Sequence, residues 1–302
     1  MYKFNAEILL LALLAVLWGS SYIFIRIAVA EIPPLTLIAC RVTGAGLFLL
    51  FVLWLKGESL PRGRQVWRML LVQSFLNSFG AWTVLAWGQQ YVSAGLASVL
   101  NSVSPVFVYL ISVFVLRNAP TEQRKLLGAL IGCFGVVLIV GIDVLAGLGR
   151  QVVAQLACLA GALMYAGAAL YGRRFAKTGA LATASGTMIW ASAVLVPLAL
   201  IVDRPWLLHP GQSAIGATLV LSVFCTGVAL LIYFRLLHSL GPMGVASQSY
   251  LRAGVGVVLG LVFLGESITP LAVAGVAAAI LGVVLINWPA SRFNQTTKGA
   301  SK

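Results

Sequence analysis

The chain has 302 residues, of which 61% are hydrophobic and only 9% charged, and its mean hydropathy is +1.01. This composition excludes a soluble domain with a solvated basic face, so the net charge of +13 does not indicate a nucleic-acid partner. A helix of roughly 20 apolar residues crosses a hydrocarbon layer about 30 Å thick. The alternating pattern of a barrel strand is absent, so the sequence predicts an all-α integral membrane protein.

Ten apolar spans follow one another along the chain, separated by short loops that carry Pro and Gly. The spans expected in the first half are Ile8–Ala28, Thr36–Leu55, Val66–Trp87, Ala94–Leu116 and Leu126–Val144. Those expected in the second half are Val152–Gly172, Leu181–Val202, Ala214–Phe234, Pro242–Leu264 and Leu271–Trp288. The first span is too long for a cleaved signal, so we expect it to remain in the mature protein.

Basic residues fall almost entirely in alternate gaps between these spans. Fifteen of the 20 Lys and Arg residues lie on one side, in the N-terminal segment, the gaps after the even-numbered spans and the tail. The opposite loops carry only Arg150 and Arg204. Because basic loops remain on the cytoplasmic side, both termini are predicted to be cytoplasmic.

The two halves of the chain share an ordered set of short blocks. Trp18-Gly19 corresponds to Tyr165-Ala166, residues 93–98 correspond to 242–247, and glycines 128 and 135 correspond to glycines 275 and 282. Each half holds five spans, an odd number, so the second half must enter the membrane from the opposite face. We therefore predict ten transmembrane helices in two inverted five-helix repeats around a central cavity, residues 1–147 and 148–290, with a disordered cytoplasmic tail at 291–302. Inverted repeats hold their substrate near the bilayer midplane.

These blocks also carry a family resemblance. The residues concerned are Trp18-Gly19, Arg41, Ser93-Ala94-Gly95-Leu96-Ala97-Ser98 before Pro105, and Leu264-Gly265-Glu266-Ser267-Ile268-Thr269 before Gly275 and Gly282. Over about residues 7–288 the chain resembles the EamA repeat of the drug/metabolite transporter superfamily, and it looks most like the bacterial YddG-type exporters of aromatic and other amino acids. The resemblance implies a cavity lined mainly by helices one, three, four, six, eight and nine, in a bacterial inner (plasma) membrane. One departure is Arg117, which stands where the second copy has Glu266.

The strongest candidate for holding a substrate is Arg252, ten residues into the ninth span and so near mid-depth. A charged side chain at that depth usually faces a wet cavity or a partner. An arginine there can bind a carboxylate through two charge-assisted hydrogen bonds. The alternative is a cation satisfied by backbone carbonyls, or by Asn101 and Ser102, without a role in binding. Gln248 lies one turn earlier on the same face.

The other candidates are polar or aromatic residues deep within the spans, for which lining a pocket and plain packing both remain open. Convergent aromatic faces and amide groups would suit a zwitterion with an apolar side chain. The predicted substrate-binding residues are Trp18, Tyr22, Gln73, Asn77, Ser78, Trp82, Asn101, Tyr165, Gln248, Tyr250 and Arg252.

Several kinds of chemistry are missing from the sequence. It has no phosphate-binding GxxxxGK[ST] loop, no HExxH motif and no metal-ligand spacing among its Cys and His residues, so we expect no enzyme, cofactor or metal. All seven acids lie at span ends or in loops. Proton-coupled carriers usually place a titratable carboxylate within the membrane. We therefore expect uniport or weakly coupled transport.

Three functional classes remain: a small-molecule carrier, an intramembrane enzyme, and a channel or scaffold. The carrier accounts for the inverted repeat and the midplane polar groups, and the resemblance implies export of amino acids, aromatic and other apolar ones, by alternating access. The alternative is an exporter of drugs, lipophilic cations or other small metabolites, although a cation site would be expected to contain an acid. The expected partners are a small-molecule substrate and the lipid bilayer, and the chain is expected to be a monomer or weak homodimer.

Overall fold

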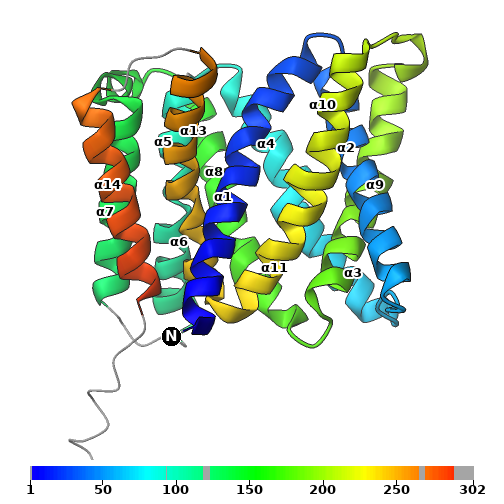
Figure 1. Cartoon of the computed structure of the whole chain (residues 1–302), viewed down its shortest axis with the longest axis horizontal. Coiled ribbons are helices and arrows are strands. Elements are labelled where there is room, and N and C mark those ends of the chain that lie inside the picture. Colours follow the sequence, from blue (N-terminus) through cyan, green and yellow to red (C-terminus); the bar gives the residue numbers. More distant parts are fainter. Residues whose placement is uncertain (1, 93, 118–122, 265–268, 289–302) are drawn as a thin grey trace, which may run out of the picture.

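The computed structural model describes residues 2–92, 94–117, 123–264 and 269–288. These residues form a bundle of helices that run up and down between two edges, and they include no strand (Figure 1). Glu266, one of the residues that carry the family resemblance, lies outside the described residues, and so does the predicted disordered tail at 291–302.

Each predicted span corresponds to one helix or to a stack of shorter helices. In the first half these are α1 (Tyr2–Val29), α2 (Pro34–Leu55), α3 (Arg64–Ser74) with η1 (Phe75–Phe79) and α4 (Gly80–Gln89), α5 (Ala94–Asn101) with α6 (Ser104–Leu110) and η2 (Ile111–Val115), and α7 (Gln123–Val140). In the second half they are α8 (Val152–Gly172), α9 (Ala180–Val202), α10 (Gln212–Ser222) with η6 (Val223–Val228) and α11 (Ala229–Ser239), α12 (Gly241–Ala246) with α13 (Gln248–Leu264), and α14 (Pro270–Asn287). Short 3-10 turns follow at η3 (Ile142–Gly147), η4 (Arg173–Phe175) and η5 (Pro205–Leu207).

The membrane-spanning character of the bundle is confirmed. Within the described residues, nine helical segments are long and apolar enough to cross a membrane. The remaining predicted span, the ninth, contains α13, a helix of 17 residues. The end of the fifth span was predicted too late, because α7 ends at Val140 and Gly141 then adopts φ 101, a left-handed conformation that glycine tolerates.

The second half enters the bundle from the opposite edge to the first. In Figure 1, α1 begins at the lower edge and α8 begins at the upper edge, which is the inverted arrangement that the odd number of spans predicts. The N-terminal end of α1 and the C-terminal end of α14 therefore lie at the same edge. The basic loops that follow α2 and α8 lie at this lower edge too, which we call the basic end.

Both repeats interrupt the same helices in the same way. The third span of each half contains a π-helical segment, η1 in the first half and η6 in the second. The fourth span of each half is broken near mid-depth, after α5 in one case and after α12 in the other. At these breaks Ser102 and Ser247 each donate a hydrogen bond to the carbonyl three residues earlier, at 2.7 Å and 2.6 Å. Each hydroxyl thus takes up a carbonyl at the end of an interrupted helix.

Two helix pairs form the sides of the bundle. On one side α7 crosses α14, and on the other α2 packs along α9 (Figure 1). The α7–α14 crossing uses the glycines that repeat in the sequence: a Cβ at Gly135 would lie 2.7 Å from the Gly275 carbonyl oxygen, and one at Gly128 would lie 2.9 Å from that of Gly282. Small residues let two helix backbones approach in lipid, where packing rather than the hydrophobic effect drives association.

The broken helices separate above their point of crossing. Below the breaks α6 packs against α12, whereas above them α5 packs against α8 and α13 packs against α1. The segments α11 and α12 also pack against α8 at the basic end. The two breaks therefore lie where packed lower halves give way to diverging upper halves.

Gly135→Ala is expected to lower the free energy of unfolding by about 1–3 kcal/mol, the usual range for overpacking. The added methyl group would lie 2.6 Å from the backbone nitrogen of Ala279, which cannot move aside as a side chain can. The matched control is Gly216→Ala on α10, where a Cβ meets nothing within 4 Å. Thermal unfolding of the purified proteins measures the effect, and equal midpoints for the two variants would contradict this account of the crossing.

Candidate substrate site

The first candidate residues lie on α13, where Gln248 and Arg252 share a face. Tyr250 lies on the opposite face, because residues two positions apart in a helix are rotated by about 200°. Its hydroxyl donates to the Ala129 carbonyl at 2.9 Å, and a Cβ at Gly132 would lie 2.4 Å from its ring. Since α7 borders the bundle, Gln248 and Arg252 lie on the side of α13 that faces the interior (Figure 1). The structure thus places Tyr250 in a helix–helix contact, apart from these two candidates.

A single turn of α1 connects α13 with the π-helical segment η6. A Cβ at Gly19 would lie 2.7 Å from a Val255 methyl carbon and 3.5 Å from the Arg252 carbonyl oxygen, so only a glycine allows this approach. The hydroxyl of the next residue, Ser20, lies 3.9 Å from the Cys225 sulfur in η6. Arg252 and η6 therefore flank the same turn of α1.

On the η6 side of this turn the structure places a second arginine, Arg41 of α2. Its Nε donates to the Thr226 hydroxyl at 2.6 Å, and its Nη2 donates to the Cys225 carbonyl at 3.3 Å. Its guanidinium carbon lies 4.9 Å from the centre of the Trp82 ring. A cation over an aromatic face is attracted by the negative charge of that face. Trp82, a predicted substrate-binding residue, thus pairs with Arg41, which was not among the predicted substrate-binding residues.

Arg41 was not among the predicted site residues and entered only through the family resemblance. A signal for it existed, since few arginines lie within the predicted spans: Arg26, Arg41, Arg68 and Arg252. What the sequence does not show is the π-helical segment, whose extra residue per turn presents the Thr226 hydroxyl to α2. Segments of this kind are frequent at functional sites.

The remaining aromatic candidates lie on two sides of the interior. The ring centre of Trp18 on α1 lies 5.7 Å from that of Tyr233 on α11, at a tilt of 41°. Tyr165 of α8 packs against a separate buried cluster that includes Leu85, Leu96 and Cys158. The side chain of Tyr22 lies outside the described residues. The aromatics therefore occur on both the α1 side and the α8 side of the bundle.

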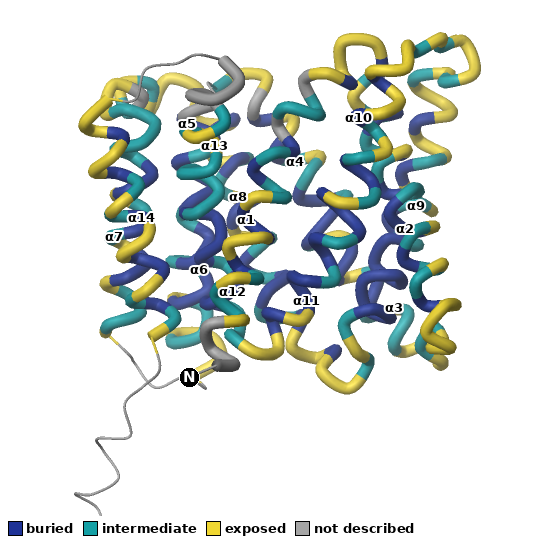
Figure 2. Tube along the Cα trace, in the orientation of Figure 1, coloured by how far each residue is buried: buried dark blue, intermediate teal, exposed yellow. Residues whose placement is uncertain are grey.

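The predicted polar residues of the third span are all buried. Gln73 and Ser78 are fully buried, and Asn77 is 4% exposed. Gln73 lies where three helices meet, because a Cβ at Gly172 of α8 would lie 3.6 Å from both its amide atoms and 2.5 Å from Leu237 of α11. The structure thus places Gln73 in a packed contact among α3, α8 and α11. Buried residues gather around these helices in the lower half of Figure 2.

Asn101 ends α5, directly before the break in the fourth span. The next residue, Ser102, lies 3.6 Å from the Cys133 sulfur of α7, and Ser247, at the break of the second repeat, accepts a hydrogen bond at 3.1 Å from Asn287 of α14. Each break is thus attached to the last helix of its own repeat. Asn101 is the last residue before the break of the first repeat, and Gln248 is the first residue after the break of the second.

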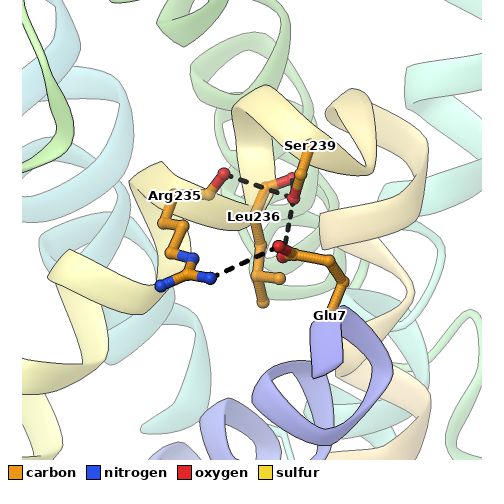
Figure 3. A network of polar contacts seen from close by, with 4 residues as sticks. All are labelled: Glu7, Arg235, Leu236 and Ser239. Atoms are coloured by element: carbon orange, nitrogen blue, oxygen red, sulfur yellow. Dashed lines mark hydrogen bonds and ion pairs between the residues drawn. The ribbon is translucent and has the colours of Figure 1, made fainter. Parts of the chain in front are cut away.

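Acidic side chains lie away from this region. Among the described residues, acids occur only at helix ends and in loops. At the basic end, Glu7 of α1 accepts a hydrogen bond from Ser239 at 2.8 Å and pairs with Arg235 of α11 at 3.5 Å (Figure 3). On the opposite side, Asp203 accepts hydrogen bonds from the backbone and hydroxyl of Thr36, both at 2.8 Å. The acids whose contacts are described here thus lie at the two ends of the bundle.

Related proteins were found by sequence and by structure. The model of the EamA-like transporter family matches residues 5–141 and again residues 152–288. An uncharacterized inner membrane transporter, YedA of Escherichia coli strain K12, is 27% identical over 273 residues, covering 90% of this chain and 88% of its own. An uncharacterized transporter of Bacillus subtilis, YvbV, is 29% identical, covering 92% and 90%.

Two further similarities bear on function and on fold. A protein of Streptantibioticus cattleyicolor named a probable terminal-alkyne amino-acid exporter is 27% identical over 292 residues, covering 94% of each chain. A solved crystal structure superposes with a TM-score of 0.80 at 18% identity, covering 95% of this chain and 99% of its own, which supports the fold alone. The specific likeness to YddG-type exporters stays a prediction. Since the family model covers both halves, the chain is a membrane transporter rather than an enzyme, and it belongs to the EamA-like transporter family.

Proposed function

We propose that this transporter exports amino acids, aromatic and other apolar ones, from the cytoplasm by alternating access. The observation that carries the proposal is Arg252, an intramembrane arginine on the interior face of α13. Such an arginine is costly in lipid, by about 2.5–3.5 kcal/mol on insertion scales, and can bind a carboxylate with two hydrogen bonds. Aromatic rings on both sides of the interior suit an apolar side chain.

The similarity to a named exporter supports this substrate class. The Streptantibioticus protein is named a probable terminal-alkyne amino-acid exporter, and the alignment covers 94% of both chains. The runner-up, export of lipophilic cations, drugs or other metabolites, is less consistent with the charges of the site. A bound cation would be repelled by Arg252 and Arg41, and no carboxylate among the described interior residues would offset that repulsion.

We propose further that the basic end faces the cytoplasm of a bacterial cell, that both termini lie on that side, and that the chain acts as a monomer or weak homodimer. The loops at the basic end, which include the segments 56–63 and 173–179, carry most of the Lys and Arg residues. Cytoplasmic loops carry such an excess in multi-pass proteins.

This orientation predicts which loops react with a membrane-impermeant thiol reagent. In a variant whose four native cysteines are replaced by Ser, we expect Gln212→Cys at the upper edge to be labelled in intact cells. Ser59→Cys, equally exposed but in a basic loop, is expected to react only after the cells are opened. Labelling of Ser59→Cys in intact cells would contradict the proposed orientation.

Arg252→Ala is expected to reduce transport of carboxylate-bearing substrates at least about tenfold while leaving expression and folding largely intact, because a charge-assisted pair is lost. The matched control is Arg150→Ala, which removes an exposed arginine from a loop at the other edge. The measurement is flux of labelled amino acids into vesicles that contain the purified protein. Wild-type flux in Arg252→Ala would contradict the assignment of carboxylate binding to this residue.

We also propose that transport is uniport or only weakly coupled to protons, because no acid of the described residues lies at mid-depth. In proteoliposomes, amino-acid flux down its own gradient is expected to change less than about twofold when a pH difference is imposed, since no intramembrane carboxylate is available to titrate. Accumulation of substrate against its gradient only in the presence of the pH difference would contradict uniport.

A further inference from the structure

Three buried amide oxygens have no hydrogen-bond donor among the described residues, those of Gln73, Asn101 and Gln248, and the last two lie beside the helix breaks. Asn101 and Gln248 are each 8% exposed, and neither Oδ1 of Asn101 nor Oε1 of Gln248 accepts a hydrogen bond from any described residue. A buried acceptor left without a donor costs roughly 1–3 kcal/mol. Native proteins satisfy nearly all such groups, so an exception requires an explanation.

The positions of these two oxygens in the fold are related. Asn101 is the last residue of α5, and Gln248 is the first residue of α13. The broken helices cross where α6 packs against α12, and beyond the crossing α5 runs with α8 while α13 runs with α1. We call this arrangement a fork: Asn101 and Gln248 stand on its two arms, each beside a break.

Both breaks are fixed by their neighbours, so the two amides are held in place. Ser102 contacts Cys133 of α7, and Tyr250 packs on the adjacent residue, Gly132. Two consecutive residues of α7 thus support both arms of the fork. Because Tyr250 occupies the α7 face of its helix, Gln248 lies on the opposite face, which it shares with Arg252.

The chemistry of the fork is that of a cation acceptor beside an anion acceptor. An amide oxygen without a donor is complementary to N–H groups. Gln248 and Arg252 are neighbours on one helix face, about 5–6 Å apart at their Cβ atoms. A ligand that carries an ammonium and a carboxylate on the same carbon would satisfy both groups at once.

We propose that Asn101 and Gln248 form an ammonium subsite, which together with Arg252 selects α-amino acid zwitterions over carboxylates that lack the amine. This inference rests on the proposed function and specifies its substrate: a free, unacylated ammonium group is required. The ammonium donates to Oδ1 of Asn101 and Oε1 of Gln248, and the carboxylate accepts from the Arg252 guanidinium. The side chain of the amino acid would then contact the aromatic residues on the α1 and α8 sides of the interior.

The test compares ligands that share one ring and differ in charge. Binding of labelled phenylalanine and 3-phenylpropanoate, the same acid without the ammonium, is measured on the purified full chain and on Asn101→Leu and Gln248→Leu. Each variant is expected to bind phenylalanine about tenfold more weakly or worse, because hydrogen bonds to charged groups are lost, and 3-phenylpropanoate as the wild type does. In Gln248→Glu, which places a carboxylate at the subsite, 2-phenylethylammonium is expected to bind more tightly than to the wild type.

Misfolding is distinguished by the unliganded proteins. Each leucine variant removes an acceptor that has no donor, so its thermal midpoint is expected to equal or exceed that of the wild type. Ser112→Ala, in the fourth span but outside the fork, is the matched control and is expected to bind phenylalanine normally.

Two outcomes would overturn the inference in different ways. Equal weakening of phenylalanine and 3-phenylpropanoate in the leucine variants would assign the two amides a structural role and leave amino-acid export standing. If the wild type binds neither phenylalanine nor any other α-amino acid of a labelled panel, the proposed function and the subsite both fail.

Discussion

The whole architecture depends on one constraint, that backbone N–H and C=O groups in hydrocarbon must find partners within the protein. It explains why each described segment of the bundle is helical, and it makes every interruption of a helix informative. The chain breaks its fourth and ninth spans in the middle, where unpaired carbonyls would be most costly, and then takes up carbonyls with the hydroxyls of Ser102 and Ser247. A break that is repaired in the same way in both repeats is a built feature. It is also the place where polar backbone, polar side chains and diverging helices occur together.

Charge within the bundle follows the same reasoning. A guanidinium at mid-depth loses its hydration, and protein groups must replace it. Around Arg41 these groups are the Thr226 hydroxyl, the Cys225 carbonyl and the face of Trp82. None of them is anionic, so the positive charge is accommodated without being neutralised. The solvation of a buried guanidinium is thus supplied here by a hydroxyl, a backbone carbonyl and an aromatic face.

The sequence was sufficient for the architecture because hydropathy, loop charge and the odd number of spans per half are all readable one residue at a time. It was much less informative about the candidate site. Tyr250 and Gln248 are two residues apart and were predicted together, yet one packs on α7 while the other faces the interior. In a chain this apolar nearly every face of a helix is hydrophobic, so hydrophobicity does not show which face of α13 packs on a neighbouring helix and which faces the interior. Only the positions of the neighbouring helices show this. Arg41 could not be assigned because its partners lie 185 residues away, on a π-helical segment that no local pattern announces.

The amides without partners also bear on how the bundle can move. Both amide atoms of Gln73, like the oxygens of Asn101 and Gln248, are buried without a hydrogen bond among the described residues. Gln73 lies at the packed contact of α3, α8 and α11, toward the basic end, so that contact carries a desolvation cost that opening it would relieve. A carrier that alternates between two states needs them to be close in free energy, and an unsatisfied polar group raises the free energy of the closed contact. The tightly packed glycines of the α7–α14 crossing show the opposite character, a contact with no polar group to release. If the protein alternates between two states as proposed, the contact around Gln73 is the better candidate to open and the α7–α14 crossing the better candidate to stay closed.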